Sequence, residues 1–278
     1  TRSMASGARI LEVIDEKVDL TDEKVRNIEV ERGSVDFEHV WFKYKKEAKE
    51  YVLSDISFHI EAGQTVGVIG QTGAAKSTLM QLIPRLYDAT EGVVKVDGVP
   101  VQEYPMANLR EAIAMVLQKN TLFSGSLLDN LRWGKEDASM EEIEEACRIA
   151  CVDEVLERLP EGYETEMGQG GVNVSGGQKQ RICIARALLK KPKILILDDS
   201  TSAVDTATEA KIRERMGAAL PDMTKIIIGQ RISSVRHADQ IIILDDGRVS
   251  AIGTHEELLA RSEIYQQIYE SQKEGVEL

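Results

Sequence analysis

The sequence lacks the features of a membrane span, a disulfide-stabilised fold or a nucleic-acid-binding surface. The 278 residues contain no run of about 18 apolar residues, so no segment is predicted to cross a bilayer. The three cysteines, Cys147, Cys151 and Cys183, match no disulfide or zinc pattern, which favours core packing in a reducing compartment. The net charge of −13 disfavours nucleic acid as a partner, because such surfaces are basic.

The composition that is present suits one large globular unit. Charged residues make up 29% of the chain and hydrophobic residues 42%. The first residue is Thr1 rather than methionine, and a helical pattern over residues 3–16 is already under way there. We therefore expect the sequence to be part of a longer chain.

Short strand-like runs alternate with helical patterns in the second half of the chain. The runs "ILILD" (194–198), "KIIIGQ" (225–230) and "QIIILDDG" (240–247) are rich in β-branched residues. This alternation predicts an α/β fold with a largely parallel sheet that helices cover on both faces. Strand patterns near the start, and a hairpin turn at Asp97-Gly98, add antiparallel strands.

Helix boundaries can also be predicted. A helical pattern begins at Lys76 and continues through residue 87, and a second, over 175–191, stops at Pro192. Thr254 and Glu257 form a capping box for a last helix over 255–272.

The segment "VGVIGQTGAAKST" (66–78) predicts a phosphate-binding P-loop. It reads as a strand, a glycine-containing turn and a helix start, with Gly70, Gly73, Lys76 and Ser77 at the motif positions. Backbone N–H groups would cradle phosphates, Lys76 would meet the β/γ charge, and Ser77 would bind Mg²⁺. A chance glycine-rich turn is the alternative. It is disfavoured because Lys76 and Ser77 follow the glycines at the spacing that the motif requires. Ala75 replaces the second glycine, at a cost of about 1 kcal/mol if its φ is positive.

Three further motifs resemble the nucleotide-binding domain of an ABC transporter of the exporter type. They are Gln118 in "MVLQKNTLFSGSLLDNL", the signature "SGGQKQR" (175–181), and "ILILDDSTSAVD" (194–205). The resemblance implies a P-loop NTPase (RecA-like) core with a mainly parallel sheet, an antiparallel β subdomain and an ABC-type α-helical subdomain at about 119–185. It assigns 29–278 to the nucleotide-binding domain, and 1–28 to the cytoplasmic end of a transmembrane helix and a linker.

The resemblance also implies ATP and Mg²⁺ as cofactors and a role for each motif residue. Tyr44 would stack on adenine, although an ordinary strand aromatic is the alternative. The implied nucleotide contacts are Tyr44, Gly70, Gly73, Ala74, Ala75, Lys76, Ser77, Thr78, Ser175, Gly176, Gly177 and Gln178. The implied metal contacts are Ser77, Gln118 and Asp198, and the implied catalytic positions are Gln118, Asp199 and Gln230.

Two of these positions depart from the family pattern. Asp199 stands where the family usually has glutamate as general base, and it is one methylene shorter. Gln230 stands at the switch histidine, and glutamine can hydrogen-bond a phosphate but cannot carry a proton or positive charge. His237, seven residues on, is predicted to be a surface residue.

Together with Ala75, these departures predict an impaired ATP site beside a nearly intact signature. That combination resembles one half of a heterodimeric ABC exporter at the cytoplasmic face of the cell membrane. The partners implied are a second, different half-transporter and the chain's own transmembrane domain, which would dock at residues 121–130. The chain would hold ATP itself, and its signature would complete the partner's catalytic site.

Three other functions are considered. A self-sufficient homodimeric ABC ATPase would need the base and switch residues that Asp199 and Gln230 replace. A soluble ABC-type protein of DNA repair or chromosome organisation would commonly carry a coiled-coil or zinc insertion. A regulatory nucleotide-binding module without transport would not need the opening helix.

Overall fold

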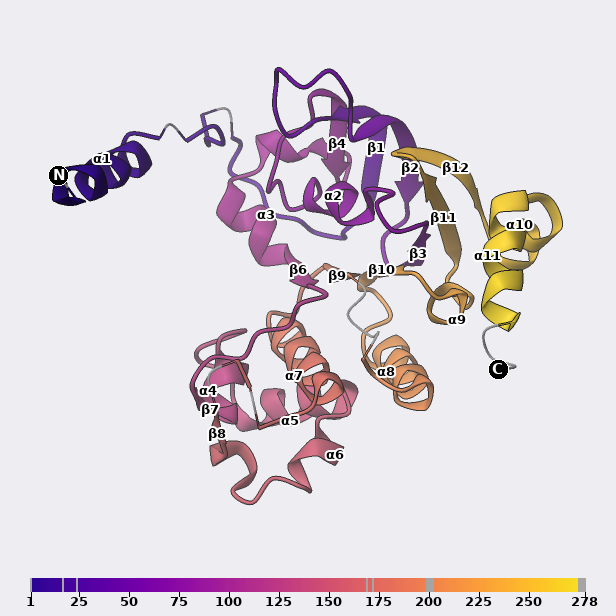
Figure 1. The fold of residues 1–278 in the computed structure, drawn as a ribbon. Helices are drawn as coiled ribbons and strands as arrows, with labels where there is room; N and C mark the ends of the chain where they lie inside the picture. Colours follow the sequence, from indigo (N-terminus) through magenta and orange to yellow (C-terminus); the bar gives the residue numbers. More distant parts are fainter. Residues whose placement is uncertain are drawn as a thin grey trace.

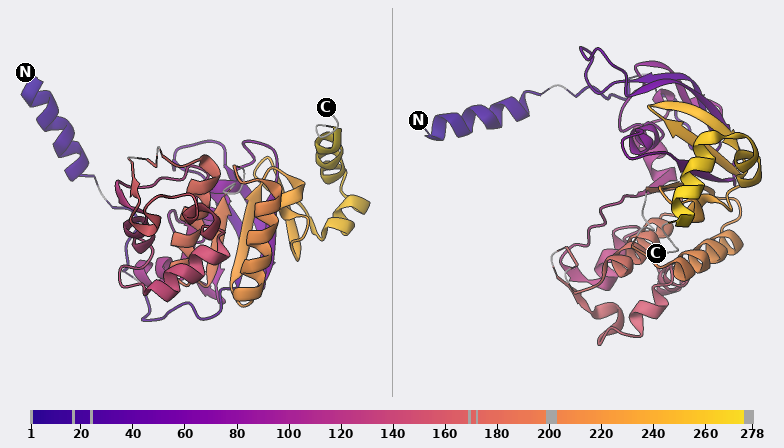
Figure 2. Two further views of the ribbon diagram at one scale, coloured as in Figure 1. Left: turned by 90° about the horizontal axis from the view of Figure 1, so that it is seen from below. Right: turned by 45° about the vertical axis from the view of Figure 1, so that its right-hand side comes forward.

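The computed structural model describes residues 2–16, 18–23, 25–168, 170–171, 173–198 and 203–274 (Figure 1). Two sheets and their helices form one body, and a group of helices lies at one end of it. Helix α1 (Arg2–Ile14) extends away from this body in every view (Figures 1 and 2). None of the helices in these ranges is long and apolar enough to cross a bilayer.

The central sheet carries the elements that position the site. Its order is β12-β11-β3-β10-β9-β6, and all neighbouring pairs are parallel except β11 with β12. The strands are β3 (Thr65–Ile69), β6 (Ile113–Val116), β9 (Ile194–Asp198), β10 (Thr224–Gly229), β11 (Gln240–Asp245) and β12 (Arg248–Gly253). All five residues of β9 are buried, as expected of a parallel strand covered on both faces.

A second, antiparallel sheet has the order β2-β1-β4-β5. Its strands are β1 (Val35–Phe42), β2 (Leu53–Ile60), β4 (Glu91–Val96) and β5 (Val99–Pro100). Buried and exposed residues alternate along much of β2, so one face packs inward. A two-stranded ladder, β7 (Gly125–Ser126) with β8 (Glu166–Met167), lies among the helices at the end of the molecule (Figure 1).

The helices divide between the body and its end (Figure 1). Those on the body are α2 (Lys76–Gln81), α3 (Met106–Ala112), α9 (Ile232–Val235), α10 (His255–Arg261) and α11 (Glu263–Glu274), with the 3₁₀ turn Val101–Glu103. Those at the end are α4 (Leu127–Arg132), α5 (Met140–Ile149), α6 (Asp153–Leu156) and α7 (Gly176–Leu189), with the 3₁₀ turn Gly162–Glu164. Apolar side chains of α4, α5 and α7 form one buried cluster that continues into β6 and β9. Helix α8 (Thr206–Ala219) lies beside α7 (Figure 1), and its Ile212 and Met216 belong to the same buried cluster as α7.

The predicted fold class is confirmed: the chain is α/β, with a mainly parallel sheet, an antiparallel sheet and a helical group. The capping box of Thr254 and Glu257 is present, and Asp97-Gly98 forms the predicted turn. Two helix predictions were too long. Helix α2 ends at Gln81, and the predicted last helix is two helices separated at Ser262.

Candidate functional site

A cavity of about 330 Å³ lies where strands β3, β9 and β10 reach their carboxyl ends. In open α/β sheets, ligands bind outside this end of the strands. Eight of the predicted site residues line this cavity: Gly73, Ala75, Lys76, Ser77, Thr78, Gln118, Asp198 and Gln230. Val52, Thr72 and Ile228 complete the lining. The sequence therefore identified most of the lining side chains.

The loop from β3 to α2 requires glycine for two different reasons. At Gly70, a Cβ atom would lie 2.1 Å from the Leu244 carbonyl oxygen in β11, so no side chain fits. Gly73 has open space around it, but its φ is +89°, a conformation that side chains disfavour. The loop can therefore pass close to β11 at Gly70 and turn sharply at Gly73 before α2 begins.

Ala75 adopts the conformation for which the family uses glycine. It is the N-cap residue of α2, with φ 67° and ψ 23° in the left-handed region. The conformational cost anticipated from the sequence therefore applies. Ala74, the residue before it, is buried and is not among the residues with positive φ.

Lys76 lies across the loop. Its Nζ donates hydrogen bonds to the carbonyl oxygens of Gly70, at 2.8 Å, and Gln71, at 2.9 Å. The ammonium group is thus held at the mouth of the cavity, where it can meet phosphate oxygens without reorganising the loop.

Tyr44 adjoins the P-loop helix through a hydrogen bond. Its hydroxyl lies 2.8 Å from Thr78 Oγ1, and either oxygen can be the donor. The ring is half exposed and stands edge-on to Phe42 and Tyr87. An exposed aromatic face next to the phosphate loop is suited to stacking on a base. The Tyr44–Thr78 bond was not anticipated, since no sequence signal pairs two residues 34 positions apart.

Oxygen atoms that could bind a metal line the cavity from the ends of two strands, β6 and β9, and from the first turn of α2. Asp198 is the last residue of β9 and is only 8% exposed, while Gln118 lies two residues beyond β6. Together with the Ser77 hydroxyl, these side chains offer a carboxylate, an amide and a hydroxyl oxygen. Hard oxygen ligands of this kind fit Mg²⁺, which usually takes one or two carboxylates and completes its shell with phosphate and water.

The signature residues lie elsewhere, at the start of α7. The Ser175 hydroxyl accepts a hydrogen bond from the Gln178 N–H at 3.2 Å, and Gln178 Oε1 accepts one from the Ser175 N–H at 2.8 Å. This reciprocal capping box fixes the helix start but leaves Ser175 and Gln178 outside the cavity described above. Gly176 and Gly177 form the first turn of the same helix.

The signature helix is tied to the chain segment that follows β9. A Cβ atom at Gly177 would lie 2.7 Å from the Ala203 carbonyl oxygen, and the Ala203 N–H donates to Gln180 Oε1 at 3.2 Å. Gln180 is 3% exposed. No sequence signal pairs Gln180 with Ala203, and their contact links the signature helix to the segment after β9 within one chain. Asp199 lies outside the described residues, so its predicted reach stays a prediction.

His237 is not among the residues that line the 330 Å³ cavity. It lines a separate cavity of about 150 Å³ beneath α8, together with Arg213 and Lys225. Burial and the positive charges of Arg213 and Arg236 lower its pKa. The three cysteines are buried free thiols, and the described residues contain no cluster of three or more His, Cys, Asp or Glu residues that could hold a metal.

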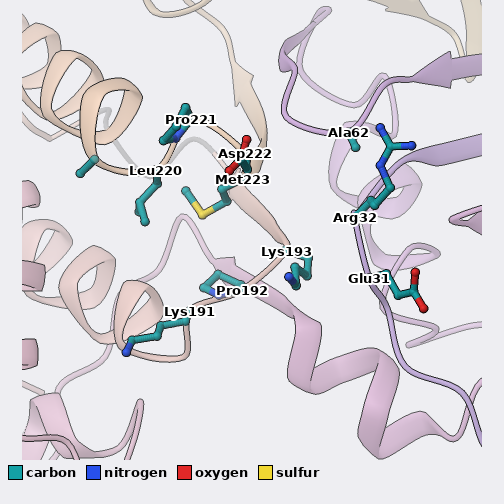
Figure 3. Close-up of a pocket in the computed structure, with 11 residues that line it drawn as sticks. Glu31, Arg32, Ala62, Lys191, Pro192, Lys193, Leu220, Pro221, Asp222 and Met223 are labelled. Carbon is teal, nitrogen blue, oxygen red and sulfur yellow. The ribbon is translucent and has the colours of Figure 1, made fainter.

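A larger hollow, of about 500 Å³, lies at the opposite end of the sheet (Figure 3). Glu31 and Arg32 stand on one side of it and Leu220 and Met223 on the other. Lys193, which precedes β9, also lines it. Because this hollow lies at the amino ends of β9 and β10, it is not where an α/β sheet binds its ligand.

Comparison with known proteins identifies the family. A family model described as "ABC transporter" matches residues 53–202. The chain belongs to the ABC transporter family. It is an ABC-type ATPase domain, and the family implies that its ligand is ATP.

The similarity of this ABC domain to individual proteins extends over nearly all of its length. It is 47% identical, over 279 aligned residues, to the ABC transporter ATP-binding protein YfiB of Bacillus subtilis, covering 100% of this chain and 48% of that protein. It is 38% identical to an ATP-dependent lipid A-core flippase of Legionella pneumophila, covering 99% of this chain and 46% of that protein.

A solved structure of a bacterial Atm1-family ABC exporter with ATP bound superposes on the ABC domain with a TM-score of 0.91, at 36% identity. The match covers 98% of this chain and 48% of that one. The ABC domain thus spans about half the length of the relatives it matches.

Proposed function

We propose that the chain is the ATP-binding half of an ABC exporter and works paired with a second nucleotide-binding domain. The observation that carries this proposal is that Lys76, Ser77, Gln118, Asp198 and Gln230 line one cavity, which we call the nucleotide cavity. The similarity of the chain to an ABC exporter with ATP bound supports the same conclusion. As in other phosphoryl transfers, positioning and charge neutralisation would drive catalysis.

Within this site each side chain has a proposed task. Tyr44 stacks on adenine, the N–H groups of the loop from Gly73 to Ser77 bind phosphate oxygens, and Lys76 neutralises their charge. Ser77, Gln118 and Asp198 hold Mg²⁺, which supplies positive charge to the phosphates when bound. Gln230 donates a hydrogen bond from its side-chain amide to the terminal phosphate.

We further propose that this site hydrolyses ATP weakly. The left-handed Ala75 strains the loop, Gln230 cannot carry a proton, and Asp199 is short for a general base. The start of α7 keeps its capping box and its two glycines, which supports an active role for the signature. Ser175, Gly176 and Gly177 would then act on ATP held by a different partner chain.

Contact with a transmembrane domain is proposed at a groove of about 380 Å³ beside α4 and α7. Phe123 and Trp133 stack there with ring centroids 4.5 Å apart, and the Arg186 guanidinium lies over Phe123. Phe123 is 43% exposed and Trp133 66%, so the stacked pair presents a contiguous apolar surface of the kind that marks interaction sites. Residues 1–28 would connect to that membrane domain, placing residues 29–278, with the helical subdomain at 119–185, at the cytoplasmic face.

The decisive experiment measures Mg-ATP binding and hydrolysis by the purified chain. We expect the chain to bind Mg-ATP with little turnover, and Lys76→Ala to weaken binding about ten- to a hundredfold, because a charge-assisted contact contributes roughly 1.5–3 kcal/mol. Lys193→Ala, at the opposite end of the sheet, is the matched control and should bind normally. Rapid hydrolysis by the chain alone, unaffected by dilution, would contradict the impaired site.

A further inference from the structure

The C-terminal helix α11 contacts the chain segment that carries Gln230. The Gln272 side chain makes two hydrogen bonds there: its Nε2 donates to the Gln230 carbonyl oxygen at 2.7 Å, and its Oε1 accepts from the Ile232 N–H at 2.9 Å. One amide group thus spans the backbone of residues 230–232. The two contacts join positions 42 and 40 residues apart in the sequence.

The amide supplies what the start of α9 lacks. Ile232 is the first residue of α9, and its N-cap residue, Arg231, makes no side-chain capping bond in the described chain. The first N–H groups of a helix have no partner inside the helix and need an acceptor from elsewhere. Gln272 provides that acceptor with one end of its amide and holds the preceding carbonyl with the other.

Apolar packing holds α11 where this contact can form. Ile232 and Val235 of α9 belong to one buried cluster with Tyr265 of α11, which has no exposed surface. Ile268 and Tyr269 of α11 pack against the same cluster. Moving Gln272 away from residues 230–232 would therefore disturb this packing, so α11 and the segment are expected to move together.

The held segment reaches the nucleotide cavity. Gln230 lines that cavity with Lys76 and Asp198, and its carbonyl oxygen accepts a hydrogen bond from Gln272. The direction of a side chain is set by the backbone that carries it, and small displacements at a binding site weaken directed hydrogen bonds. Within the described part of the chain, the Gln272 side chain hydrogen-bonds the backbone of Gln230 and Ile232 and no residue of the P-loop, so its effect on the cavity would pass through Gln230.

We propose that Gln272 is a positioning residue that fixes Gln230 for contact with the terminal phosphate of ATP. This inference rests on the proposed role of Gln230. Through Gln272, helix α11 would affect how strongly the site prefers ATP over ADP, because ADP lacks the phosphate that Gln230 would contact. Displacement of α11 would then weaken ATP binding without weakening ADP binding.

The test replaces Gln272 with methionine, which has similar length and no hydrogen-bonding amide. Affinities for ATP and ADP are measured by calorimetry with Mg²⁺ on the full chain. We expect Gln272→Met to lower the preference for ATP over ADP about three- to tenfold, as for the loss of a directed hydrogen bond, with the affinity for ADP unchanged. Exchange of the Ile232 amide proton, followed by NMR, should become faster because its acceptor is gone.

Gln266→Met is the matched control. Gln266 also lies on α11 and its Nε2 donates to the Leu259 carbonyl oxygen at 2.6 Å, but in the described ranges its side chain makes no hydrogen bond to residues 230–232. This variant should keep the normal ratio of ATP to ADP affinity. An equal loss in both variants would mean that general loosening of α11 is responsible, and the proposal would be wrong.

Variants of Gln230 separate this inference from the function on which it rests. If both hold, Gln230→Ala also lowers the preference for ATP, and adding Gln272→Met lowers it no further. If Gln230→Ala lowers the preference and Gln272→Met does not, the positioning role fails while the role of Gln230 stands. If Gln230→Ala has no effect, the role of Gln230 fails and the inference about Gln272 fails with it.

Discussion

A single methyl group strains the phosphate loop at Ala75. A left-handed conformation costs an L-residue roughly 1–2 kcal/mol, whereas glycine adopts it freely. Glycine also gives the unfolded chain more conformational entropy than alanine does, which cancels about 0.4–1 kcal/mol of the stability gained by relieving the strain. We therefore predict that Ala75→Gly raises the free energy of unfolding by about 0.5–1 kcal/mol, measured by urea denaturation.

The neighbouring alanine provides the control for that measurement. Ala74 is not among the residues with positive φ, and it is 5% exposed. Ala74→Gly makes the same chemical change without relieving strain, so it should destabilise the chain. Equal destabilisation by both substitutions would show that the left-handed conformation at Ala75 carries no cost.

A second effect at the residue scale is that the Asp97 carboxylate holds the backbone of the segment that leads into β1. Its two oxygens accept hydrogen bonds from the backbone N–H groups of residues 31–34, at 2.8–3.0 Å, just before β1 begins. Burial acts to raise the pKa of Asp97, but the bonds from Arg32, Ser34, Glu31 and Gly33 outweigh it, and the pKa is lower than usual.

We predict that Asp97→Asn lowers the free energy of unfolding near neutral pH by about 1–2 kcal/mol, since charge-assisted bonds are lost and an amide NH₂ faces N–H donors. Because the folded pKa is lowered, the wild-type advantage is present above the unfolded pKa of about 3.9 and disappears as pH falls through the folded value. Denaturation of both proteins from pH 7 to 3 measures this.

The hairpin between β11 and β12 offers a matched control for Asp97. Asp246-Gly247 forms the same kind of turn, with positive φ at both residues, and the described chain shows no hydrogen bond to the Asp246 carboxylate. Asparagine suits such turns as well as aspartate does. Asp246→Asn should therefore leave stability unchanged. A similar loss at both turns would mean that the turn, not the bonds to residues 31–34, is responsible.

At the scale of elements, the sequence predicted the helix and strand features that depend on residues close to one another in the chain. The buried strand β9 and the capping box at Thr254 depend on residues close in sequence, and both appear as expected. The division between α10 and α11 was missed because no glycine or proline marks it. Ser262 leaves the helical conformation there, and its Oγ accepts from the Tyr265 N–H at 3.3 Å.

The candidate site follows the same division. The P-loop, Gln118, Asp198 and Gln230 could be predicted, because strand ends of one parallel sheet meet at one edge. The contacts of Gln272 with residues 230–232, of Gln180 with Ala203, and of Tyr44 with Thr78 could not. Each joins polar groups far apart in the sequence, and only the packed fold brings them together.

At the scale of the whole molecule, the signature at the start of α7 lies outside the nucleotide cavity of its own chain. A substitution there can therefore test whether the signature acts on ATP held by a partner chain. Gly177→Asp is a poor choice, because its Cβ would already meet the Ala203 carbonyl oxygen within the same chain. Ser175→Ala removes one hydroxyl, and its only structural cost is a helix cap, worth about 0.5–2 kcal/mol. Ser139→Ala removes an equivalent cap at the start of α5 and is the matched control.

We predict that Ser175→Ala lowers steady-state ATP hydrolysis of the assembled pair about ten- to a hundredfold, as for loss of a hydrogen bond to a charged phosphate, worth roughly 1.5–3 kcal/mol. Ser139→Ala should lower stability alone, and Asp199→Ala should barely change the rate, because the productive site would use the partner's base. If Asp199→Ala were the most damaging of the three, Asp199 would be a working base. The two sites would then not divide binding and catalysis between them, and the pair would hydrolyse ATP in both.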